Sequence, residues 1–486
     1  MMKLFSLAFL SAEFLEDHET WLKHNNGSND FSKDHPPFLH RFNAGSALCG
    51  AISESIPILE RVRKYECAMI LLEKLLSQEK YLRKRRGRWY ERLCINLKHL
   101  GSDSLVENAC LRCLSDPYVP KNGAYNLSAK KRLLRYQKTQ KKTKTKLNSG
   151  ADCDSNNDKN TNIAIEPRWE TIRIAGKATN KKTGEKSRFV SKTEHIIGCD
   201  LTCSIESLAL QYFSSSSESQ SQSQPTSKNN DGVWDGIHCE GTPFRSLFTL
   251  LLWDVIFDSS VPDVFQNRFQ NAPLDLSCGN DLEEDEEKEE MYSSLFYRNR
   301  VSSISKRIEE IKNMTQVKLA TTVKDTWCEK RNTGAIGIDW NYGYNVQTLQ
   351  YIAACLGPDG IAAILLRMCM NYSHWVGGMP DLFLVRAFHR DTGAQIFLLD
   401  TNLCQSFGKR VFEQRPVIDH DAEKKTDSME LTSPMDMEYL STIRCECMFV
   451  EVKGPNDRLS EKQQLWLNYL VENNIPAKVL KINSVK

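Results

Sequence analysis

Two stretches near the C terminus decide the fold: GGMPDLFLVRAF at Gly377–Phe388 and FVEVKGPNDRLSEKQQLWLNYL at Phe449–Leu470. Each contains an apolar run beside turn residues, which favours a β-strand. Ser460 precedes a run with helical spacing, and its hydroxyl is placed to accept hydrogen bonds from the first free amides of a helix. AKVLKI at 477–482 predicts a last strand. Together with apolar helical spacing from residue 345 onward, this order of elements predicts an α/β arrangement.

The polar residues of the two stretches suit the hydrolysis of a phosphodiester. Glu451 and Lys453 stand two residues apart, so strand geometry points both side chains to one face, with Asp381 as a candidate neighbour on the ladder. Two carboxylates can hold Mg²⁺ or Mn²⁺, the Val452 carbonyl can add an oxygen, and Lys453 can orient the attacking water. The alternative for the tripeptide alone is an ordinary surface ion pair, which is the commoner case.

Apolar residues between Ile56 and Leu100 recur every three or four positions, which predicts an α-helical hairpin. Between its helices lies YLRKRRGRWYER at 81–92, where guanidinium groups interleave with aromatic rings. These groups either contact phosphates or form a solvated basic helix face. The basic stretch Lys130–Lys146 runs into polar residues and predicts a charged linker that contacts phosphates or serves as a nuclear localisation signal.

The middle of the chain mixes regular and low-complexity segments. Trp169–Lys192 predicts a β-hairpin, and SIESLALQYF at 204–213 predicts a helix. Ser214–Asp231 and Gly279–Glu290 are polar and acidic repeats, which favour disordered surface loops. The longest apolar run, Ser246–Phe257, is too short to span a bilayer and predicts a buried helix, so we expect no membrane partner.

Length and charge bound the class of protein. At 486 residues and 55.7 kDa, two or three domains are expected, and 64 basic against 62 acidic residues identify neither nucleic acid nor membrane as a partner. The 16 cysteines include one tight pair, Cys110 and Cys113, without a second pair at zinc-finger spacing. We therefore expect reduced thiols and a reducing compartment. The opening MMKLFSLAFLSA resembles the core of a signal peptide, but the acidic residues after it favour a buried helix.

GGMPDLFL followed by FVEVKGPNDRLSEKQQLWL resembles the VRR-NUC module of the PD-(D/E)XK nuclease superfamily. With the upstream stretches at 85–100 and 235–276, the chain is similar to an N-terminally shortened member of the Fanconi-associated nuclease family. The resemblance implies a restriction-endonuclease-like mixed sheet flanked by helices and preceded by a TPR-like helical region. It also implies a structure-selective nuclear DNA nuclease, a 5′-flap endonuclease and 5′-3′ exonuclease, that uses Mg²⁺ or Mn²⁺ in interstrand crosslink repair.

The resemblance also assigns residues. Their numbers in this sequence are Glu240, Asp381 and Glu451 for metal binding, to which the Val452 carbonyl suggested above is added, then Asp381, Glu451, Lys453 and Gln463 for catalysis, and Arg86, Arg88 and Arg92 for a DNA 5′-phosphate pocket. A guanidinium fork suits a terminal phosphate. Where the family has a histidine shortly downstream of these arginines, this chain offers Tyr125.

The expected domains are a helical DNA-binding region at 1–135, a basic and polar linker at 136–164 and a nuclease domain at 165–486 with its VRR-NUC core at about 345–486. Within that core lies a polar insert at about 391–444, whose residues Asp419, His420 and Asp421 either mimic metal ligands or form a solvated loop, the commoner case. The sequence lacks the family's ubiquitin-binding zinc finger, so it gives no support for ubiquitylated partners. The alternatives to an enzyme are a non-catalytic scaffold for DNA junctions and, for residues 1 to 135 alone, a helical interaction module.

Overall fold

The computed structural model describes residues 2–24, 36–148, 167–177, 189–196, 199–214, 233–277, 293–341, 343–396, 398 and 440–485. The chain divides into two compact units. Unit 1 comprises residues 1–166, 258–301 and 369–374, and unit 2 comprises residues 167–257, 302–368 and 375–486. The nuclease part of the chain expected from sequence thus contributes short segments to the helical unit as well.

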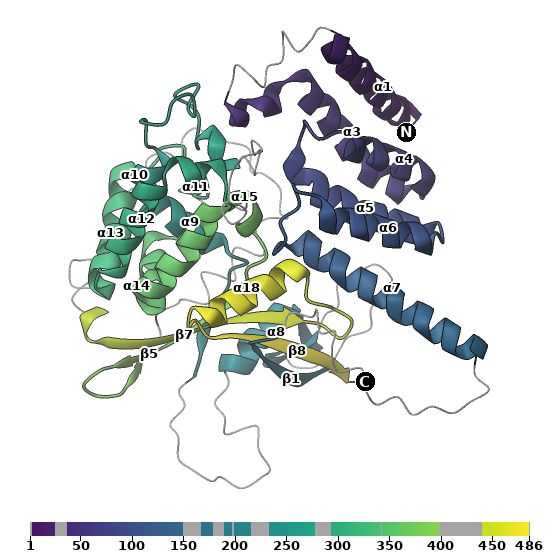
Figure 1. The fold of residues 1–486 in the computed structure, drawn as a ribbon. Helices are drawn as coiled ribbons and strands as arrows, with labels where there is room; N and C mark the ends of the chain where they lie inside the picture. Colours follow the sequence, from purple (N-terminus) through teal and green to yellow (C-terminus); the bar gives the residue numbers. More distant parts are fainter. Residues whose placement is uncertain are drawn as a thin grey trace. The chain divides into compact units, whose positions relative to one another are not determined.

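Unit 1 is helical throughout its described residues. Its main helices are α1 (Met2–His24), α3 (Ala44–Arg61), α4 (Tyr65–Ser77), α5 (Arg86–His99), α6 (Asp103–Ser115) and α7 (Ala124–Asn148), and its shorter helices are η1 (Pro37–Phe42), η2 (Arg83–Arg85), η4 (Leu274–Ser277) and α11 (Leu295–Asn299). Consecutive helices pack side by side (Figure 1). Their shared core includes Leu15, Ile52, Leu72, Trp89 and Cys110, all nearly inaccessible to solvent. Stacked helix pairs of this kind are the arrangement expected of TPR-like repeats.

Two sequence expectations for unit 1 need correction. The predicted hairpin is three helices, because the chain breaks after α3 at Arg63, whose φ of 59° lies in the left-handed region. The linker expected from residue 136 begins as helix, since α7 continues to Asn148. Lysine, glutamine and arginine are good helix formers, which explains why a polar, basic run extends the helix. Residues 149–166 lie outside the described part of the chain.

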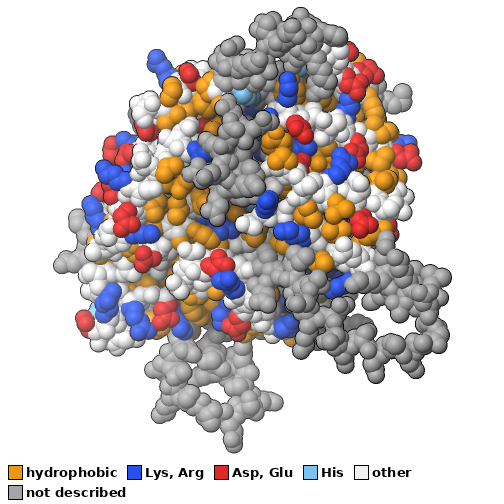
Figure 2. Space-filling model, in the orientation of Figure 1, with side chains coloured by type: hydrophobic (Ala, Val, Ile, Leu, Met, Phe, Trp, Pro, Cys, Tyr) orange, Lys and Arg blue, Asp and Glu red, His pale blue; other side chains and the backbone are white. Residues whose placement is uncertain are grey.

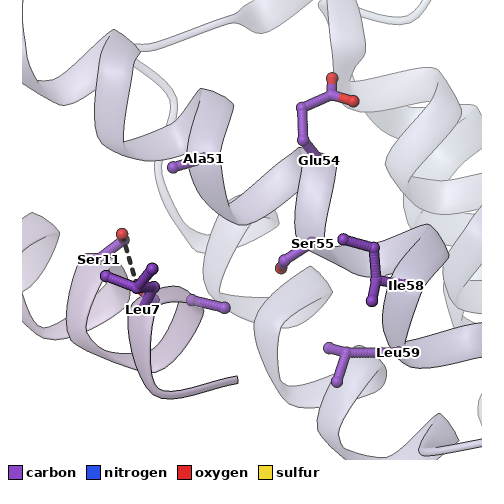
Figure 3. Close-up of a pocket in the computed structure, with 8 residues that line it drawn as sticks. Leu7, Ser11, Ala51, Glu54, Ser55, Ile58 and Leu59 are labelled. Carbon is purple, nitrogen blue, oxygen red and sulfur yellow. Dashed lines mark hydrogen bonds between the residues drawn. The ribbon is translucent and has the colours of Figure 1, made fainter. Parts of the chain in front are cut away.

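An apolar cavity of about 220 Å³ lies between α1 and α3 in unit 1 (Figure 3). Leu7 and Ala8 line it from α1, and Ile58 and Leu59 line it from α3. The helix expected for the N-terminal stretch is therefore confirmed. Ala8 of helix α1 is buried in the core of unit 1, whereas Leu7 remains 57% exposed.

Unit 2 is built on a mixed sheet of six strands among the described residues, in the order β1-β8-β7-β5-β4 with β6 paired to β5. The strands are β1 (Glu170–Lys177), β4 (Asp235–His238), β5 (Leu382–His389), β6 (Gln395–Ile396), β7 (Ile443–Lys453) and β8 (Ala477–Val485). β8 runs parallel to β1 and to β7, whereas β5 is antiparallel to β4, β6 and β7. The expected α/β fold with a mixed sheet is confirmed.

Helices cover both faces of this sheet (Figure 1). α8 (Ile205–Ser214) packs against β4 and β7, and α18 (Glu461–Glu472) packs against β8. The other helices with residues in unit 2 are α9 (Thr242–Leu251), α10 (Trp253–Ile256), α12 (Val301–Lys312), α13 (Gln316–Lys330), α14 (Val346–Met370) and α15 (Tyr372–Trp375), of which α12, α14 and α15 include residues assigned to unit 1. Alternation along β5 sends Leu382 and Leu384 to the α8 side, whereas Phe383 meets Phe244 of α9 on the other side. The predicted helices and strands of the C-terminal stretches are confirmed.

The β-hairpin expected at Trp169–Lys192 is wrong. β1 pairs in parallel with β8, with Glu170 opposite Lys478, 308 residues later in the chain, and β2 (Phe189–Ile196) pairs instead with β3 (Cys199–Cys203). β1 can bury its apolar side chains only at the sheet edge, so the long-range pairing prevails over a local turn.

Helix α14 is the one described helix with the length and hydropathy of a membrane span. It consists of two segments broken at Gly357, whose φ is 77°, followed by Pro358. Most of its apolar window is buried among other elements, which is the pattern of a core helix. The two helices expected there from the sequence correspond to its two halves.

The low-complexity segments lie largely outside the described residues, as do Asp419, His420 and Asp421. Two edges of the expected 391–444 insert are regular, because β6 follows β5 and β7 begins at Ile443. Surface Lys and Arg side chains intermingle with Asp and Glu on the face drawn in Figure 2. This mixture agrees with the net charge of +2.

Candidate metal and nuclease site

The sheet brings Asp381 and Glu451 together at one end of β5 and β7. Leu382 pairs with Val450 in the antiparallel register, which places Asp381 opposite Glu451. Asp381 Oδ2 accepts a hydrogen bond of 2.8 Å from the Val452 amide. The ladder neighbours expected from the E-x-K spacing are therefore real neighbours. A backbone amide, rather than a flexible side chain, fixes the orientation of the Asp381 carboxylate.

Glu451 is fully buried, yet its side chain has two charged or polar partners. Its Oε1 accepts from Lys453 Nζ at 2.5 Å and from Gln463 Nε2 at 2.5 Å. Burial, and next the charge of Asp381, raise the pKa of Glu451 to about 8, while Lys453 opposes this rise. Burial also raises the pKa of Asp381. Two carboxyl groups are thus held together in a dry place that disfavours their negative charge.

Gln463 reaches Glu451 because helix α18 begins at Ser460. Ser460 Oγ accepts from the Gln463 amide at 3.2 Å, and Gln463 Oε1 accepts from the Ser460 amide at 2.9 Å, which completes a capping box. The predicted N-cap is confirmed. The Gln463 side chain uses its oxygen for the helix cap and its nitrogen for Glu451, so a glutamate would serve only the first purpose.

Glu240 enters the site from a sharp turn after β4. Its φ of 43° and that of 80° at Gly241 lie in the left-handed region, which is costly for a residue with a side chain. The amides of Cys239 and Glu240 donate to the Asp381 carbonyl at 2.8 and 3.4 Å. His238 Nε2 lies 3.4 Å from Glu240 Oε1. The turn therefore presents His238 and Glu240 to Asp381.

The donor set fits a divalent cation. One ligand atom each from His238, Glu240 and Asp381 lies within 4.8 Å of the other two. Beside them, Glu451 Oε2 is buried without a hydrogen-bond partner among the described residues. Buried polar atoms normally have a partner, and carboxylate oxygens are preferred ligands of Mg²⁺ and Mn²⁺. A cation bound between the carboxylates would give Glu451 Oε2 a ligand partner and would offset the repulsion between the charges of Asp381 and Glu451.

Two residues near the site were not expected from the sequence. His238 ends β4 and stands two residues before Glu240. The alternation of side chains along an extended chain could therefore have predicted that both point to the same side. Glu206, at the start of α8, contributes to the raised pKa of Asp381, after burial as the main cause. Only the packing of α8 against the sheet brings Glu206 near, and no spacing in the sequence predicts it.

The three arginines of the expected phosphate pocket belong to unit 1 and have unequal surroundings. Arg86 is 4% exposed, pairs with Asp116 at 2.7 Å and donates to the Leu76 carbonyl at 3.2 Å. This burial corrects the expectation that Arg86 contacts DNA, because its guanidinium is saturated inside the helical core. Arg92 forms a two-pronged pair with Glu60 and keeps 34% of its side chain exposed.

Arg88 is the arginine of the three whose side chain is exposed. It lies near enough to Tyr125 to affect the ionisation of that phenol. Burial, and next the charge of Glu91, raise the pKa of Tyr125, while the charge of Arg88 opposes the rise. Tyr125 covers the helix at Gly87, where an added Cβ would come within 2.6 Å of the ring. The tyrosine noted in place of a histidine thus does lie beside the arginine segment.

Comparisons with known proteins identify two matched regions of the chain. Residues 11–137 match the TPR domain of Fanconi-associated nuclease 1, and residues 314–399 and 427–483 match the VRR-NUC domain. Both matched regions fall where the structure has stacked helices and the carboxylate-bearing sheet. The second match contains Asp381, Glu451, Lys453 and Gln463.

Curated relatives match along most of the chain. A Fanconi-associated nuclease 1 homologue of Oryza sativa is 27% identical over 450 residues, covering 93% of this chain and 36% of that protein. Fanconi-associated nuclease 1 of Danio rerio is 28% identical over 443 residues, covering 90% and 35%. The Schizosaccharomyces pombe homologue is 26% identical over 460 residues, covering 92% and 50%. The chain thus spans about a third to a half of the length of these relatives.

A crystal structure of paFAN1 bound to DNA with a 2-nucleotide 5′ flap and a gap has a TM-score of 0.52 and 15% identity. The match covers 99% of this chain and 62% of that one, which supports the same fold. With a TPR region, a VRR-NUC region and relatives over nine-tenths of its length, the chain belongs to the Fanconi-associated nuclease family.

Proposed function

We propose that this chain is a structure-selective DNA nuclease that depends on a divalent metal ion. Its substrates are 5′-flap and other branched DNA and 5′ DNA ends, and its role is interstrand crosslink repair in the nucleus. Family membership supports this proposal. The observation that carries it is Glu451, a buried carboxylate that shares one oxygen with Lys453 and Gln463 and leaves the other free beside Asp381.

In this proposal Glu240, Asp381, Glu451 and the Val452 carbonyl hold Mg²⁺ or Mn²⁺. When bound there, the ion would supply charge neutralisation at the phosphate and activation of a water. Lys453 Nζ, held at Glu451 Oε1, orients the attacking water and faces the charge that develops on the phosphate. Gln463 keeps the Glu451 side chain in place through its amide.

In the helical region, Arg88 contacts a DNA phosphate directly. Arg92 does so once a phosphate replaces Glu60 as the partner of its guanidinium. We assign residues 1–135 to DNA binding and residues 165–486 to the nuclease domain, with the VRR-NUC core at about 345–486. Guanidinium groups bind phosphate in two-pronged fashion, so these arginines fix the position of the DNA without reading its sequence.

The test uses purified protein, Mn²⁺ or Mg²⁺, and a duplex with a 5′ flap labelled at either end. Wild type is compared with Asp381→Ala and Lys453→Ala, and with Lys478→Ala as a control. Lys478 lies on the neighbouring strand β8, in register with Val450, so its side chain points to the sheet face opposite to that of Glu451, and it pairs with Glu170 at 2.8 Å. We expect both site variants to lose at least about 100-fold in cleavage rate and the control to keep it.

Equal cleavage by all four proteins would show that another site does the chemistry. Binding of the metal-free proteins to the flap is measured in parallel by fluorescence anisotropy. Tight binding by wild type without cleavage under any metal would favour the alternative, a catalytically inactive scaffold for DNA junctions.

A further inference from the structure

His238, at the end of β4, faces the carboxylates of Glu240 and Asp381 and has no role in the function proposed above. Its ring is exposed to 44%, and its Nε2 is 3.4 Å from Glu240 Oε1. With Asp381 it forms a set of three donor atoms within 4.8 Å of one another. An octahedral ion with bonds of about 2.1 Å separates its ligand atoms by roughly 3 to 4.2 Å, so this set requires only small movements to close on an ion.

The backbone holds these three residues in place before any ion binds. His238 pairs with Leu382, the residue after Asp381, in the β4–β5 register. The Tyr344 hydroxyl donates to the His238 carbonyl at 3.0 Å. The amides of Cys239 and Glu240 donate to the Asp381 carbonyl. The backbone positions of His238, Glu240 and Asp381 are therefore fixed relative to one another.

An imidazole nitrogen changes which cation such a site prefers. Mg²⁺ favours six oxygen ligands and keeps several waters. Mn²⁺ has the same charge and a similar size, but it accepts nitrogen ligands as well as oxygen ligands. The other groups facing the site, Glu240, Asp381, Glu451 and Glu206, all offer oxygen. His238 is then the donor among them that distinguishes the two ions.

We propose that His238 is a nitrogen ligand of the metal centre and that it biases this centre toward Mn²⁺ over Mg²⁺. This inference rests on the proposed function of the same site and specifies which ion that site takes. The imidazole binds through Nε2, so it adds affinity for Mn²⁺ without adding a negative charge beside Glu240 and Asp381.

The test measures metal binding to the full chain in the absence of DNA. Mn²⁺ is titrated and followed by electron paramagnetic resonance, and Mg²⁺ is titrated by competition against it. The bound Mn²⁺ is then examined by electron spin echo envelope modulation, which detects a directly coordinated ¹⁴N. His238→Gln replaces the nitrogen by an amide oxygen of similar reach. His389→Gln, at the far end of β5, is the matched control.

We expect the Mn²⁺ dissociation constant of His238→Gln to rise about tenfold while that of Mg²⁺ stays within about twofold. The ¹⁴N modulation of wild type and of His389→Gln should disappear in His238→Gln. Equal thermal unfolding of the metal-free proteins verifies that the fold is intact. Unchanged modulation, or equal weakening for both ions, would overturn the proposal for His238 and leave the nuclease proposal standing. Absence of any Mn²⁺ binding to wild type would overturn both.

Discussion

The buried carboxyl of Glu451 predicts an unusual pH dependence of stability for the metal-free protein. Its pKa is raised from 4.5 to about 8, chiefly by burial. Between these pH values the native carboxyl keeps its proton while the unfolded chain has lost it. The native state binds more protons, so the free energy of unfolding falls as pH rises from about 4.5 to 8. Below pH 4.5 both states are protonated and the effect vanishes.

Glu451→Gln removes this ionisation while preserving the size of the side chain. The difference between 4.5 and about 8 corresponds to roughly 5 kcal/mol at about 1.4 kcal/mol per pKa unit, which is a ceiling because Lys453 loses its partner in the variant. We expect Glu451→Gln to be more stable than wild type at pH 8.5 by about 2 to 5 kcal/mol and close to wild type at pH 4.5.

The assay is urea unfolding with a chelator at pH 4.5 and 8.5, followed by tryptophan fluorescence. The signal reports mainly the unit with the sheet, because Trp21 and Trp89 are the tryptophans outside it. Glu446→Gln on the same strand, where Glu446 pairs with Arg386 at the surface, is the control and should keep the wild-type slope. A Glu451→Gln protein that is less stable at pH 8.5, or that retains the slope, would refute this reasoning.

Three further predictions concern packing and capping. Arg86→Ala leaves Asp116 buried without its partner, so it should lower the free energy of unfolding by about 3 to 5 kcal/mol in urea unfolding. Arg88→Ala should change that free energy by less than about 0.5 kcal/mol but weaken flap binding measured by fluorescence anisotropy. Trp375→Ala exposes one side of the Arg367 guanidinium, which lies 3.6 Å from that ring centroid, and should lower stability by about 2 to 4 kcal/mol in the same unfolding assay. Ser460→Ala removes the cap of α18 and should cost about 1 kcal/mol and lower the cleavage rate, since the cap orients the helix turn that carries Gln463; an unchanged rate would contradict that coupling.

Much of the strand pair that carries Asp381 and Glu451 follows from the sequence alone. The period of two along β7 places Glu451 and Lys453 on one face, and Ser460 begins the helix that follows. Such features depend on neighbours a few residues away, so a local pattern predicts them. The long stretch between β5 and β7 leaves them paired, because the cost of closing a loop grows only slowly with its length.

The failed predictions for β1 and Arg86 both involve partners distant in the chain. Trp169–Lys192 has the pattern of a hairpin, but β1 pairs with β8, and Ile172 and Ile174 pack against the core of the sheet. Arg86 looks like its neighbour Arg88, and only Asp116, thirty residues away, makes it an internal residue. Neither the side chain nor its spacing contains that information.

The sequence by itself determined the strand and helix order of the C-terminal part, the acid pair of Asp381 and Glu451 and the lysine beside it. The tertiary structure decided which of these groups is dry, which oxygen of Glu451 is free and that His238 joins the carboxylates. The physical reason is range. Strand periodicity and helix capping act between adjacent residues, whereas desolvation, pKa shifts and a shared metal site depend on what several distant segments place around one point.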